Sequence, residues 1–453
     1  MRILVNTQTP LVQFSPPSPD KPDFPKDVEL SALRQDVDYR FSPGGVTRMV
    51  YPLLQRFLAE GFIESADWVS LNPRAPATVR LPGITLHNVG LDPSRMKGYG
   101  ATKETIWAAA HGLGEPERAS GLFWTDEFAE YAFYNRTTAE RILSLDRERD
   151  FDLFYIHDFQ QLPVGHMLAT LKPKIFRWHI PFEVGRIPAS WRAPFETYLQ
   201  AYDTIVVSSE RYRKALAGLG RSGSIVLLHP YVDPKEYARP EPSEVRAAAQ
   251  KFGLRPSDQV VLVVARMDPT KAQDVAIRAV ALLKERFPHL RLVLAGNGSF
   301  SGASGGPVPS KAEAWHRHLQ ETAEGLGVAD RVVFTGHVTQ AELDALYDRC
   351  LFTVLPSVNE GFGLVVVESW LHRRATLVTK RAGISDLIEE GHDGLTFDPE
   401  DAEALARLME RLLKDNGRVR RALAEAGHRT ARRCSIETAV TAETALLTRA
   451  VEG

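Results

Sequence analysis

The chain has 453 residues, of which 44% are hydrophobic and 25% are charged, and its formal net charge at pH 7 is −2. This length predicts two or three domains, and the near-neutral balance gives no argument for a nucleic acid or an anionic membrane as partner. The two cysteines, Cys350 and Cys434, have neither the spacing of a metal site nor the number for a disulfide framework, which indicates a reducing compartment.

The first residues, Met1 to Asn6, form an apolar run that is too short for a signal peptide and predicts a strand. No uninterrupted apolar run approaches the roughly 20 residues that a membrane-spanning helix needs. We therefore expect a cytoplasmic protein. A proline-rich segment, Pro10 to Pro25, follows the first strand and predicts an irregular connection rather than a helix or a central strand.

A Gly-Gly turn, Gly44-Gly45, precedes a predicted helix. Glycines at a helix start let backbone N–H groups approach a phosphate, but a plain turn is the more frequent explanation of such a pair. Further along, Trp124, Phe128 and Tyr131 recur at helical spacing, which indicates a packed helix face rather than a platform for sugar stacking.

Parallel strands are predicted in the rest of the first half by apolar runs at 153–157, 174–178, 204–207 and 225–228. Asp158 directly follows the first of these runs, and His179 directly follows the second. Ligands of open parallel sheets bind beyond the carboxyl ends of the strands, so both residues are candidates for a site. For His179 a purely structural hydrogen-bonding role is an equal alternative.

The second half begins after a proline-rich boundary at 230–242. Strands are predicted at 260–265, 290–295, 331–334 and 375–379, with helices from Thr339 and from Asp401. A Gly/Ser-rich stretch from Gly296 to Pro309 predicts a flexible loop. The alternation of strands and helices predicts an α/β domain in each half.

Two cations follow the first strand of the second half, at Arg266 and Lys271. An arginine fork and a lysine point charge at a strand end suit a diphosphate. The alternative is that both cations are solvated in a loop. The motif that follows in the same half favours the diphosphate site.

That motif runs from Leu355 to Ser369 and joins a predicted buried strand to a predicted helix. Its glycines, Gly361 and Gly363, allow close backbone approach, and the helix start offers N–H groups to a phosphate. Glu360 precedes the turn and suits sugar hydroxyls, while Glu368, about two turns into the helix, suits a ribose. The stretch predicts a seat for a sugar nucleotide.

Together these residues resemble the signature of the retaining GT-B glycosyltransferases, in particular family four. The signature comprises Gly44-Gly45, His179, Arg266 with Lys271, and the run from Glu360 to Glu368, which matches the family's two glutamates separated by seven residues. In the first half, Tyr155–Gln160 and Trp178–Phe182 are similar to segments of the trehalose-forming enzymes, including the trehalose-phosphate synthases. Those synthases usually carry Asp-Gly-Met-Asn where this chain has Glu360–Gly363, which favours the trehalose synthases of family four.

The resemblance implies an α/β protein with the GT-B fold, in which two facing Rossmann-like domains hold the active site in the cleft between them. Residues 1–232 would form the acceptor domain and residues 233–430 the nucleotide-sugar donor domain. Residues 431–453 would form a helix that crosses back towards the first domain.

The resemblance also implies residue roles. The donor diphosphate would be held by backbone at Gly44 and Gly45 and by Arg266 and Lys271. The donor sugar and phosphate would contact Glu360 and the backbone of Gly361, Phe362, Gly363 and Leu364, and the ribose would contact Glu368. The catalytic residues would be His179 at the reacting sugar, Glu360, Arg266 and Lys271. Asp158 would bind the acceptor or a hydroxyl of the donor.

The expected reaction is retaining transfer of a hexose, with glucose favoured, from an ADP-, UDP- or GDP-hexose to a small sugar or polyol. The product would be α-linked, such as trehalose or a related compatible solute. Alternatives are a trehalose-type phosphorylase of the same fold, a mannosyltransferase acting on a glycoside, a nucleotide-sugar epimerase and a non-enzymatic sensor. Phosphate-dependent release of a sugar phosphate distinguishes the phosphorylase.

Fixed cations and N–H dipoles at the leaving diphosphate would replace a metal ion. Asp36-Val-Asp38 and Asp150-Phe-Asp152 match the Asp-x-Asp metal pattern of other glycosyltransferases, but they fit better as a loop and as the approach to a strand. We therefore expect no essential metal and no cofactor besides the nucleotide-sugar co-substrate. We expect neither nucleic acid nor membrane as a partner. The sequence is compatible with a homodimer.

Overall fold

The computed structural model describes residues 1–15, 24–42, 44–113, 116–219, 223–296, 310–414 and 416–453. The chain divides into two compact units: unit 1 comprises Met1–Tyr231 and Ile436–Gly453, and unit 2 comprises Val232–Ser435. Residues 297–309 of the predicted Gly/Ser-rich loop and residues 16–23 of the proline-rich segment lie outside the described residues.

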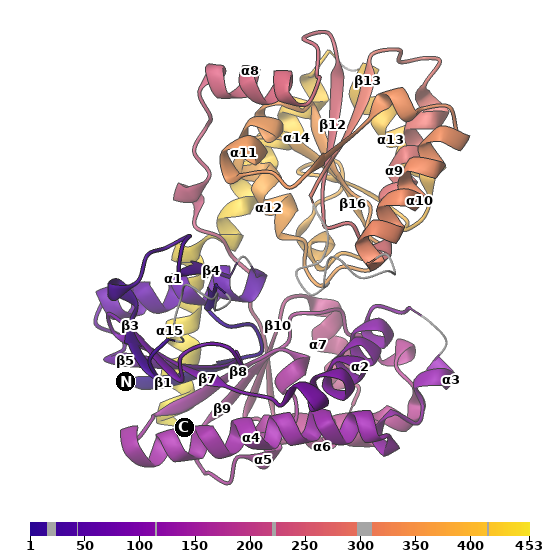
Figure 1. Cartoon of the computed structure of the whole chain (residues 1–453). Helices are drawn as coiled ribbons and strands as arrows, with labels where there is room; N and C mark the ends of the chain where they lie inside the picture. Colours follow the sequence, from indigo (N-terminus) through magenta and orange to yellow (C-terminus); the bar gives the residue numbers. More distant parts are fainter. Residues whose placement is uncertain (16–23, 43, 114–115, 220–222, 297–309, 415) are drawn as a thin grey trace. The chain divides into compact units, whose positions relative to one another are not determined.

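Unit 1 contains a sheet in which nine strands of the described residues follow the order β11-β10-β9-β8-β1-β5-β7-β6-β3 (Figure 1). Neighbouring strands are parallel except for β6 and β7. The strands are β1 (Arg2–Thr7), β3 (Asp27–Glu29), β5 (Ser65–Leu71), β6 (Thr78–Leu81), β7 (Ile84–Val89), β8 (Leu153–His157), β9 (Lys174–Arg177), β10 (Thr204–Val207) and β11 (Ser224–Leu227). A separate antiparallel pair joins β2 (Val12–Phe14) and β4 (Tyr39–Phe41).

Helices of unit 1 cover both faces of its sheet. They are α1 (Gly45–Ala59), α2 (Pro93–Ala110), α3 (Pro116–Ala119), α4 (Asp126–Arg149), α5 (Val164–Met167), α6 (Arg192–Gln200), α7 (Glu210–Ala217) and α15 (Ile436–Glu452). Alternation along β1 shows the two cores: Leu4 packs in the cluster that contains α2 and α4, while Ile3 and Val5 pack in the cluster that contains α1 and α15. A sheet that is buried on both faces explains why its central strands are nearly all apolar.

Unit 2 contains a sheet whose six described strands are parallel and follow the order β14-β13-β12-β15-β16-β17. The strands are β12 (Gln259–Val264), β13 (Leu290–Ala295), β14 (Val332–Gly336), β15 (Phe352–Leu355), β16 (Ala375–Thr379) and β17 (Leu395–Phe397). The helices are α8 (Pro242–Lys251), α9 (Gln273–Leu283), α10 (Lys311–Gly325), α11 (Gln340–Arg349), α12 (Leu364–Leu371), α13 (Ala402–Lys414) and α14 (Arg418–Thr430).

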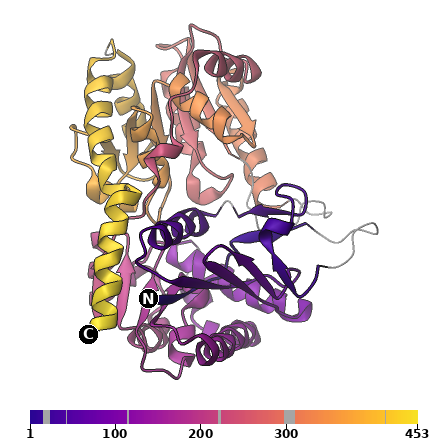
Figure 2. The same ribbon diagram turned by 90° about the vertical axis from the view of Figure 1, so that its left-hand side faces the viewer.

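The last helix, α15, is yellow in Figure 2 and belongs to unit 1. A buried ion pair joins it to the sheet of this unit. Arg177 of β9 donates to Glu443 of α15, and the two side chains are only 3% and 1% exposed. The hydroxyl of Tyr155 donates to the same carboxylate at 3.1 Å. Because a buried charge without its partner is costly, this pair is a strong constraint on where α15 packs.

The expected α/β class with two Rossmann-like parallel sheets is confirmed. The expected location of the active site, in a cleft between the domains, stays a prediction. No helix among the described residues is long and apolar enough to cross a bilayer.

The prediction for Trp124 is wrong. This residue belongs to a short 3₁₀ helix that precedes α4, and it is 90% exposed. The side chain of Thr125 caps α4 by accepting from the N–H of Phe128, so the α-helix begins after the tryptophan. Tyr131, inside α4, is buried as expected.

Strands β5 and β7 were not predicted because a buried polar pair interrupts their apolar pattern. Asp67 of β5 and His87 of β7 are both buried, and Asp67 Oδ1 lies 2.5 Å from His87 Nε2. Arg149 at the end of α4 also reaches this carboxylate, at 3.3 Å. Partners supplied by distant segments make these polar residues compatible with a central sheet.

Candidate active site

The donor-site candidates of unit 2 lie where the order of its strands reverses. β12 and β15 are neighbours, but β12 is followed in the sheet by β13 on one side, and β15 by β16 on the other. Open α/β sheets bind ligands at the carboxyl ends of the strands at such a switch point. Arg266 and Lys271 follow β12, and Glu360 to Gly363 follow β15, so the structure brings both predicted segments to this point.

Lys271 and Glu360 form an ion pair at the switch point. The Lys271 Nζ lies 2.5 Å from Glu360 Oε2, and the side chains are only 13% and 19% exposed. The hydroxyl of Ser357 donates to the same carboxylate oxygen at 3.1 Å. The pair is partly shielded from water, so its electrostatic interaction is stronger than that of an exposed pair.

Two further residues of interest belong to the same two segments. Arg266 is exposed, and its guanidinium has no ion pair within the described ranges. Asn359 is fully buried, yet neither its Oδ1 nor its Nδ2 has a hydrogen-bond partner in the part of the chain that the structure describes. Sequence reasoning missed Asn359, because only burial distinguishes it from an ordinary turn asparagine.

The turn between β15 and α12 requires glycine at position 363. Gly363 is the N-cap residue of α12 and has a φ of 106°, which residues with a side chain rarely adopt. A Cβ at this position would lie 2.8 Å from Leu355 Cδ2. No side chain caps α12, and the first N–H groups of a helix have no partner within the helix. These N–H groups point along the axis towards the switch point and suit a phosphate.

Glu368, predicted to bind ribose, lies on α12 and is 7% exposed. Its Oε1 accepts from the hydroxyl of Tyr237 at 3.2 Å, and its Oε2 accepts from the hydroxyl of Tyr347 at 3.1 Å. Burial, together with the charge of Glu368, raises the pKa of Tyr347 well above its ordinary value, so this hydroxyl remains a donor. The contacts of Tyr237 and Tyr347 with Glu368 were not predicted, because these residues lie 131 and 21 positions from Glu368 in the chain.

The unit 1 candidates also lie at a switch point, between β1 and β8. These strands are neighbours, with β5 beyond β1 on one side and β9 beyond β8 on the other. A Cβ at Gly44 would lie 3.5 Å from the side chain of Thr9, just past β1, so the start of α1 reaches this edge. A Cβ at Gly45 would meet nothing within 4 Å, and no side chain caps α1, so its N-terminus is open.

Asp158 and His179 lie together at the same edge. Asp158 has a φ of 70°, which is a strained value for a residue with a side chain. Its Oδ1 accepts from the backbone N–H of Phe159 at 3.0 Å and from that of His179 at 3.4 Å. Burial nevertheless raises the pKa of the Asp158 carboxyl to about 7. A carboxyl with this pKa changes charge near neutral pH.

His179 contacts a second histidine that sequence reasoning did not assign to the site. Its Nε2 lies 3.1 Å from Nδ1 of His157, which is buried. Burial lowers the pKa of both imidazoles well below the ordinary value, and the charge of Arg177 acts in the same direction. Both rings are therefore neutral at pH 7.

The surroundings of His157 also indicate the tautomers. The Nε2 of His157 is buried without a partner among the described residues, and a buried unpaired N–H is rare in native structures. The favoured arrangement therefore places the proton of His157 on Nδ1, which donates to His179 Nε2. His179 then carries its own proton on Nδ1 and presents a neutral donor.

The two Asp-x-Asp motifs are engaged elsewhere in unit 1. Asp38 pairs with Arg34 at 3.1 Å, Asp150 with Lys172 at 2.6 Å, and Asp152 accepts from the N–H of Arg2 at 2.6 Å. Within the described ranges no group of three or more His, Cys, Asp or Glu side chains has a metal-binding arrangement.

A family model described as "Glycosyl transferases group 1" matches residues 245–430, which lie within unit 2. Over 381 residues the chain is 33% identical to D-inositol 3-phosphate glycosyltransferase 2 of Catenulispora acidiphila, and the match covers 81% of this chain and 82% of the relative. The chain belongs to the group 1 glycosyltransferases.

This group 1 glycosyltransferase is also 28% identical over 397 residues to D-inositol 3-phosphate glycosyltransferase of Stackebrandtia nassauensis, with 86% of this chain and 83% of the relative covered. Among solved structures, the trehalose-6-phosphate synthase OtsA matches with a TM-score of 0.76, 17% identity and 99% of each chain covered. A structure described as trehalose-6-phosphate from E. coli bound with UDP-2-fluoro glucose has the same values. At this identity the likeness shows the fold, which is GT-B.

Family membership confirms that the protein is a retaining glycosyltransferase with a nucleotide-sugar donor. The resemblance to trehalose-forming enzymes is supported at the level of the fold. The group 1 relatives carry the name of a different acceptor, D-inositol 3-phosphate.

Proposed function

We propose that the protein transfers a hexose from a nucleotide-sugar to a small phosphorylated polyol or sugar, with D-inositol 3-phosphate as the first acceptor to test. The observation that carries the proposal is the Lys271–Glu360 pair beside the uncapped start of α12, at the switch point between β12 and β15. A cation, helix N–H groups and a carboxylate at one place supply complementary partners for a diphosphate and a sugar.

On the donor side, Lys271, Arg266 and the backbone from Gly361 to Leu364 bind the diphosphate in this proposal. Glu360 accepts hydrogen bonds from the hydroxyls of the donor sugar, and Glu368 accepts from the ribose. As the bond between the sugar and the diphosphate breaks, negative charge grows on the phosphate oxygens. Charges and dipoles that already point there stabilise the transition state more than the ground state, which raises kcat.

On the acceptor side, Asp158 positions the attacking hydroxyl, and the neutral Nδ1–H of His179 donates to the reacting sugar. The C1–O bond to the diphosphate breaks while the C1–O bond to the acceptor forms on the same face. The acceptor proton passes to the departing phosphate oxygen. No separate protein nucleophile is needed in this scheme, and retention follows from attack on the face from which the nucleotide leaves.

A lysine in unit 1 supports a phosphorylated acceptor. Lys103 of α2 is half-buried, burial lowers the pKa of its ammonium, and its Nζ lies 6.0 Å from the ring of Tyr99. Besides burial, the negative charge of Asp158 contributes to the raised pKa of Tyr99, so α2 passes near the proposed acceptor carboxyl. A desolvated lysine that has no ion pair within the described ranges suits the phosphate of an acceptor.

An unphosphorylated sugar acceptor, which would give a trehalose-type product, is the second candidate. The observation that favours it is the grouping of His157, Asp158 and His179, which brings together the two segments similar to trehalose-forming enzymes. The two candidates differ only in the acceptor, so one assay separates them.

The test is nucleotide release from ADP-, UDP- and GDP-hexoses in the presence of EDTA, each with D-inositol 3-phosphate, glucose 6-phosphate, glucose or no acceptor. Release that depends on a phosphorylated acceptor and falls in Lys103→Ala supports the proposal. Release that depends on free glucose supports the second candidate. Loss of all activity in EDTA, restored by a divalent cation, contradicts the metal-independent mechanism.

A further inference from the structure

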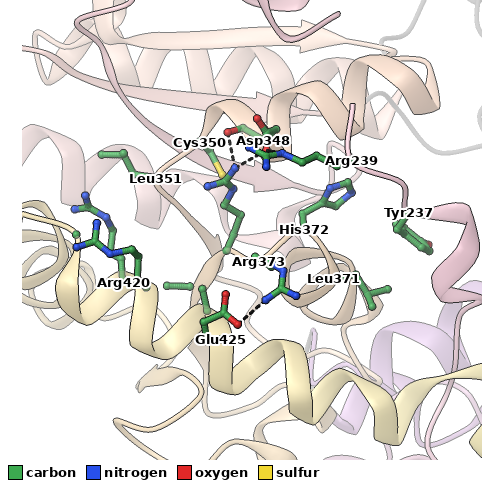
Figure 3. Close-up of a pocket in the computed structure, with 15 residues that line it drawn as sticks. Tyr237, Arg239, Asp348, Cys350, Leu351, Leu371, His372, Arg373, Arg420 and Glu425 are labelled. Atoms are coloured by element: carbon green, nitrogen blue, oxygen red, sulfur yellow. Dashed lines mark hydrogen bonds and ion pairs between the residues drawn. The ribbon is translucent and has the colours of Figure 1, made fainter. Parts of the chain in front are cut away.

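Unit 2 contains a cavity of about 570 Å³ that the proposed reaction does not use (Figure 3). Cys350 and Leu351, just before β15, and Arg374 and Ala375, at the start of β16, contribute to its wall. The cavity therefore lies at the amino-terminal edge of the sheet, whereas the turn at Gly363 lies at the carboxyl edge. Its volume is that of sites that hold small metabolites.

Positive charge is concentrated in this cavity. Its lining contains two carboxylates, Asp348 and Glu425, and five arginines, which leaves an excess of three positive charges. The arginines are Arg239, Arg373, Arg374, Arg420 and Arg421. An unbalanced group of guanidinium groups in a concave site is suited to a multiply charged anion.

The individual contacts show which guanidinium groups remain available. Arg374 is fully engaged, since it donates to the carbonyl of Tyr347 at 2.7 Å and to Asp348 Oδ1 at 2.8 Å. Arg373 pairs with Glu425 at 2.5 Å (dashed in Figure 3), but both side chains are more than half exposed, so solvent weakens this pair. The backbone N–H of Arg421 donates to the carbonyl of Gly417, but its guanidinium has no hydrogen bond or ion pair with any described residue.

The start of α14 adds dipoles to these charges. Arg420 and Glu425 both belong to α14 (Figure 3), and the N-cap residue Gly417, which also lines the cavity, provides no side-chain cap. The first N–H groups of a helix carry partial positive charge and favour anions. In addition, Arg373 adopts a φ of 54°, in the left-handed region that favours glycine.

We propose that this cavity binds a small phosphorylated metabolite with at least two negative charges, and that its occupancy regulates binding of the donor nucleotide. Arg373, Arg421 and the start of α14 supply the phosphate contacts. The volume accommodates a diphosphate or a hexose phosphate.

Residues of the cavity wall connect the cavity to Glu368 of the proposed donor site. Tyr237 and His372 line the cavity, and Tyr237 donates to Glu368. His372 stacks on Tyr347, the second donor to Glu368, with ring centroids 4.7 Å apart. Both hydrogen bonds of Glu368 therefore involve residues that form the cavity or pack on it. This part of the proposal rests on Glu368 as the ribose ligand.

Calorimetric titration of the full chain with inorganic pyrophosphate tests the site. We expect Arg373→Ala/Arg421→Ala to weaken binding about tenfold or more, because bonds to charged groups are among the stronger ones. Arg418→Ala removes a charge from the same helix outside the cavity and is the matched control, with binding kept within about twofold. Lys271→Ala should also keep this binding, since it affects only the donor site. The proposal is overturned if the wild type does not bind pyrophosphate. It is also overturned if Lys271→Ala loses pyrophosphate binding while Arg373→Ala/Arg421→Ala keeps it, or if Arg418→Ala weakens binding as much as the double variant does.

Titration of UDP with and without pyrophosphate tests the coupling. We expect pyrophosphate to change the Kd of UDP about fivefold or more, and Tyr237→Phe to abolish this change while leaving pyrophosphate bound. Identical UDP affinities with and without pyrophosphate overturn the coupling. If none of UDP, ADP and GDP binds, the proposed donor site is wrong, while the pyrophosphate titration still decides the cavity.

Discussion

Replacing Lys271 with alanine should lower kcat by about 10²- to 10³-fold. The Lys271 Nζ lies 2.5 Å from Glu360 Oε2, and both side chains are largely shielded from water. Removal of one preorganised donor from developing charge typically raises the barrier by about 3–4 kcal/mol, which corresponds to this range. Alanine also leaves the charge of Glu360 uncompensated beside the leaving diphosphate, so we expect an effect at the upper end.

Initial rates of nucleotide release at saturating donor and acceptor measure this effect. Lys251→Ala is the matched control, because Lys251 pairs with Glu342 in the same unit but is 55% exposed. Such surface pairs contribute about 0–1 kcal/mol, and kcat should stay unchanged. Lys271→Ala/Glu360→Gln should recover part of the loss if repulsion by the carboxylate contributes. Wild-type kcat in Lys271→Ala, or an equal loss in Lys251→Ala, refutes the reasoning.

Three further predictions concern other parts of the molecule. Glu443→Ala leaves the buried Arg177 without its carboxylate and should lower the free energy of unfolding of unit 1, measured in urea, by about 3–5 kcal/mol. Equal urea midpoints of the wild type and Glu443→Ala would show that the ion pair is not a strong constraint on α15. Burial raises the pKa of Asp158 to about 7, so the stability that this carboxyl contributes at low pH is lost as the pH rises through about 7. Asp158→Asn should therefore stabilise the fold by at most about 4 kcal/mol at pH 8 and far less at pH 4, and a difference independent of pH contradicts this. Gly363→Ala combines an unfavourable φ with a Cβ 2.8 Å from Leu355, and UDP affinity by calorimetry should fall about tenfold or more; an unchanged Kd argues against phosphate binding at α12.

The segments that form the proposed donor site could be singled out from the sequence because their signals are local. Glycines between an apolar run and a helix pattern predicted the turn at Glu360–Gly363, and two cations at a strand end marked Arg266 and Lys271. The ion pair between Lys271 and Glu360 was not predictable, because 89 residues separate them and only the order of the strands makes them neighbours.

Other features depend on burial, which the sequence pattern conceals. Asp67 and His87 looked unsuited to central strands until their partners were known. The raised pKa of Asp158 follows from its surroundings, not from its neighbours in the chain. The cavity arginines, such as Arg239, Arg373 and Arg421, come from separate segments and form no sequence motif.

The central claim is that the donor nucleotide binds at the carboxyl ends of β12 and β15, with its ribose on Glu368. Calorimetry with UDP, ADP and GDP on the wild type, Glu368→Gln and the surface control Glu403→Gln tests it directly. The account predicts one nucleotide site in the wild type, about tenfold weaker binding in Glu368→Gln, where neutral bonds replace charge-assisted ones, and no change in the control. Equal affinity of the wild type and Glu368→Gln for the preferred nucleotide would contradict it.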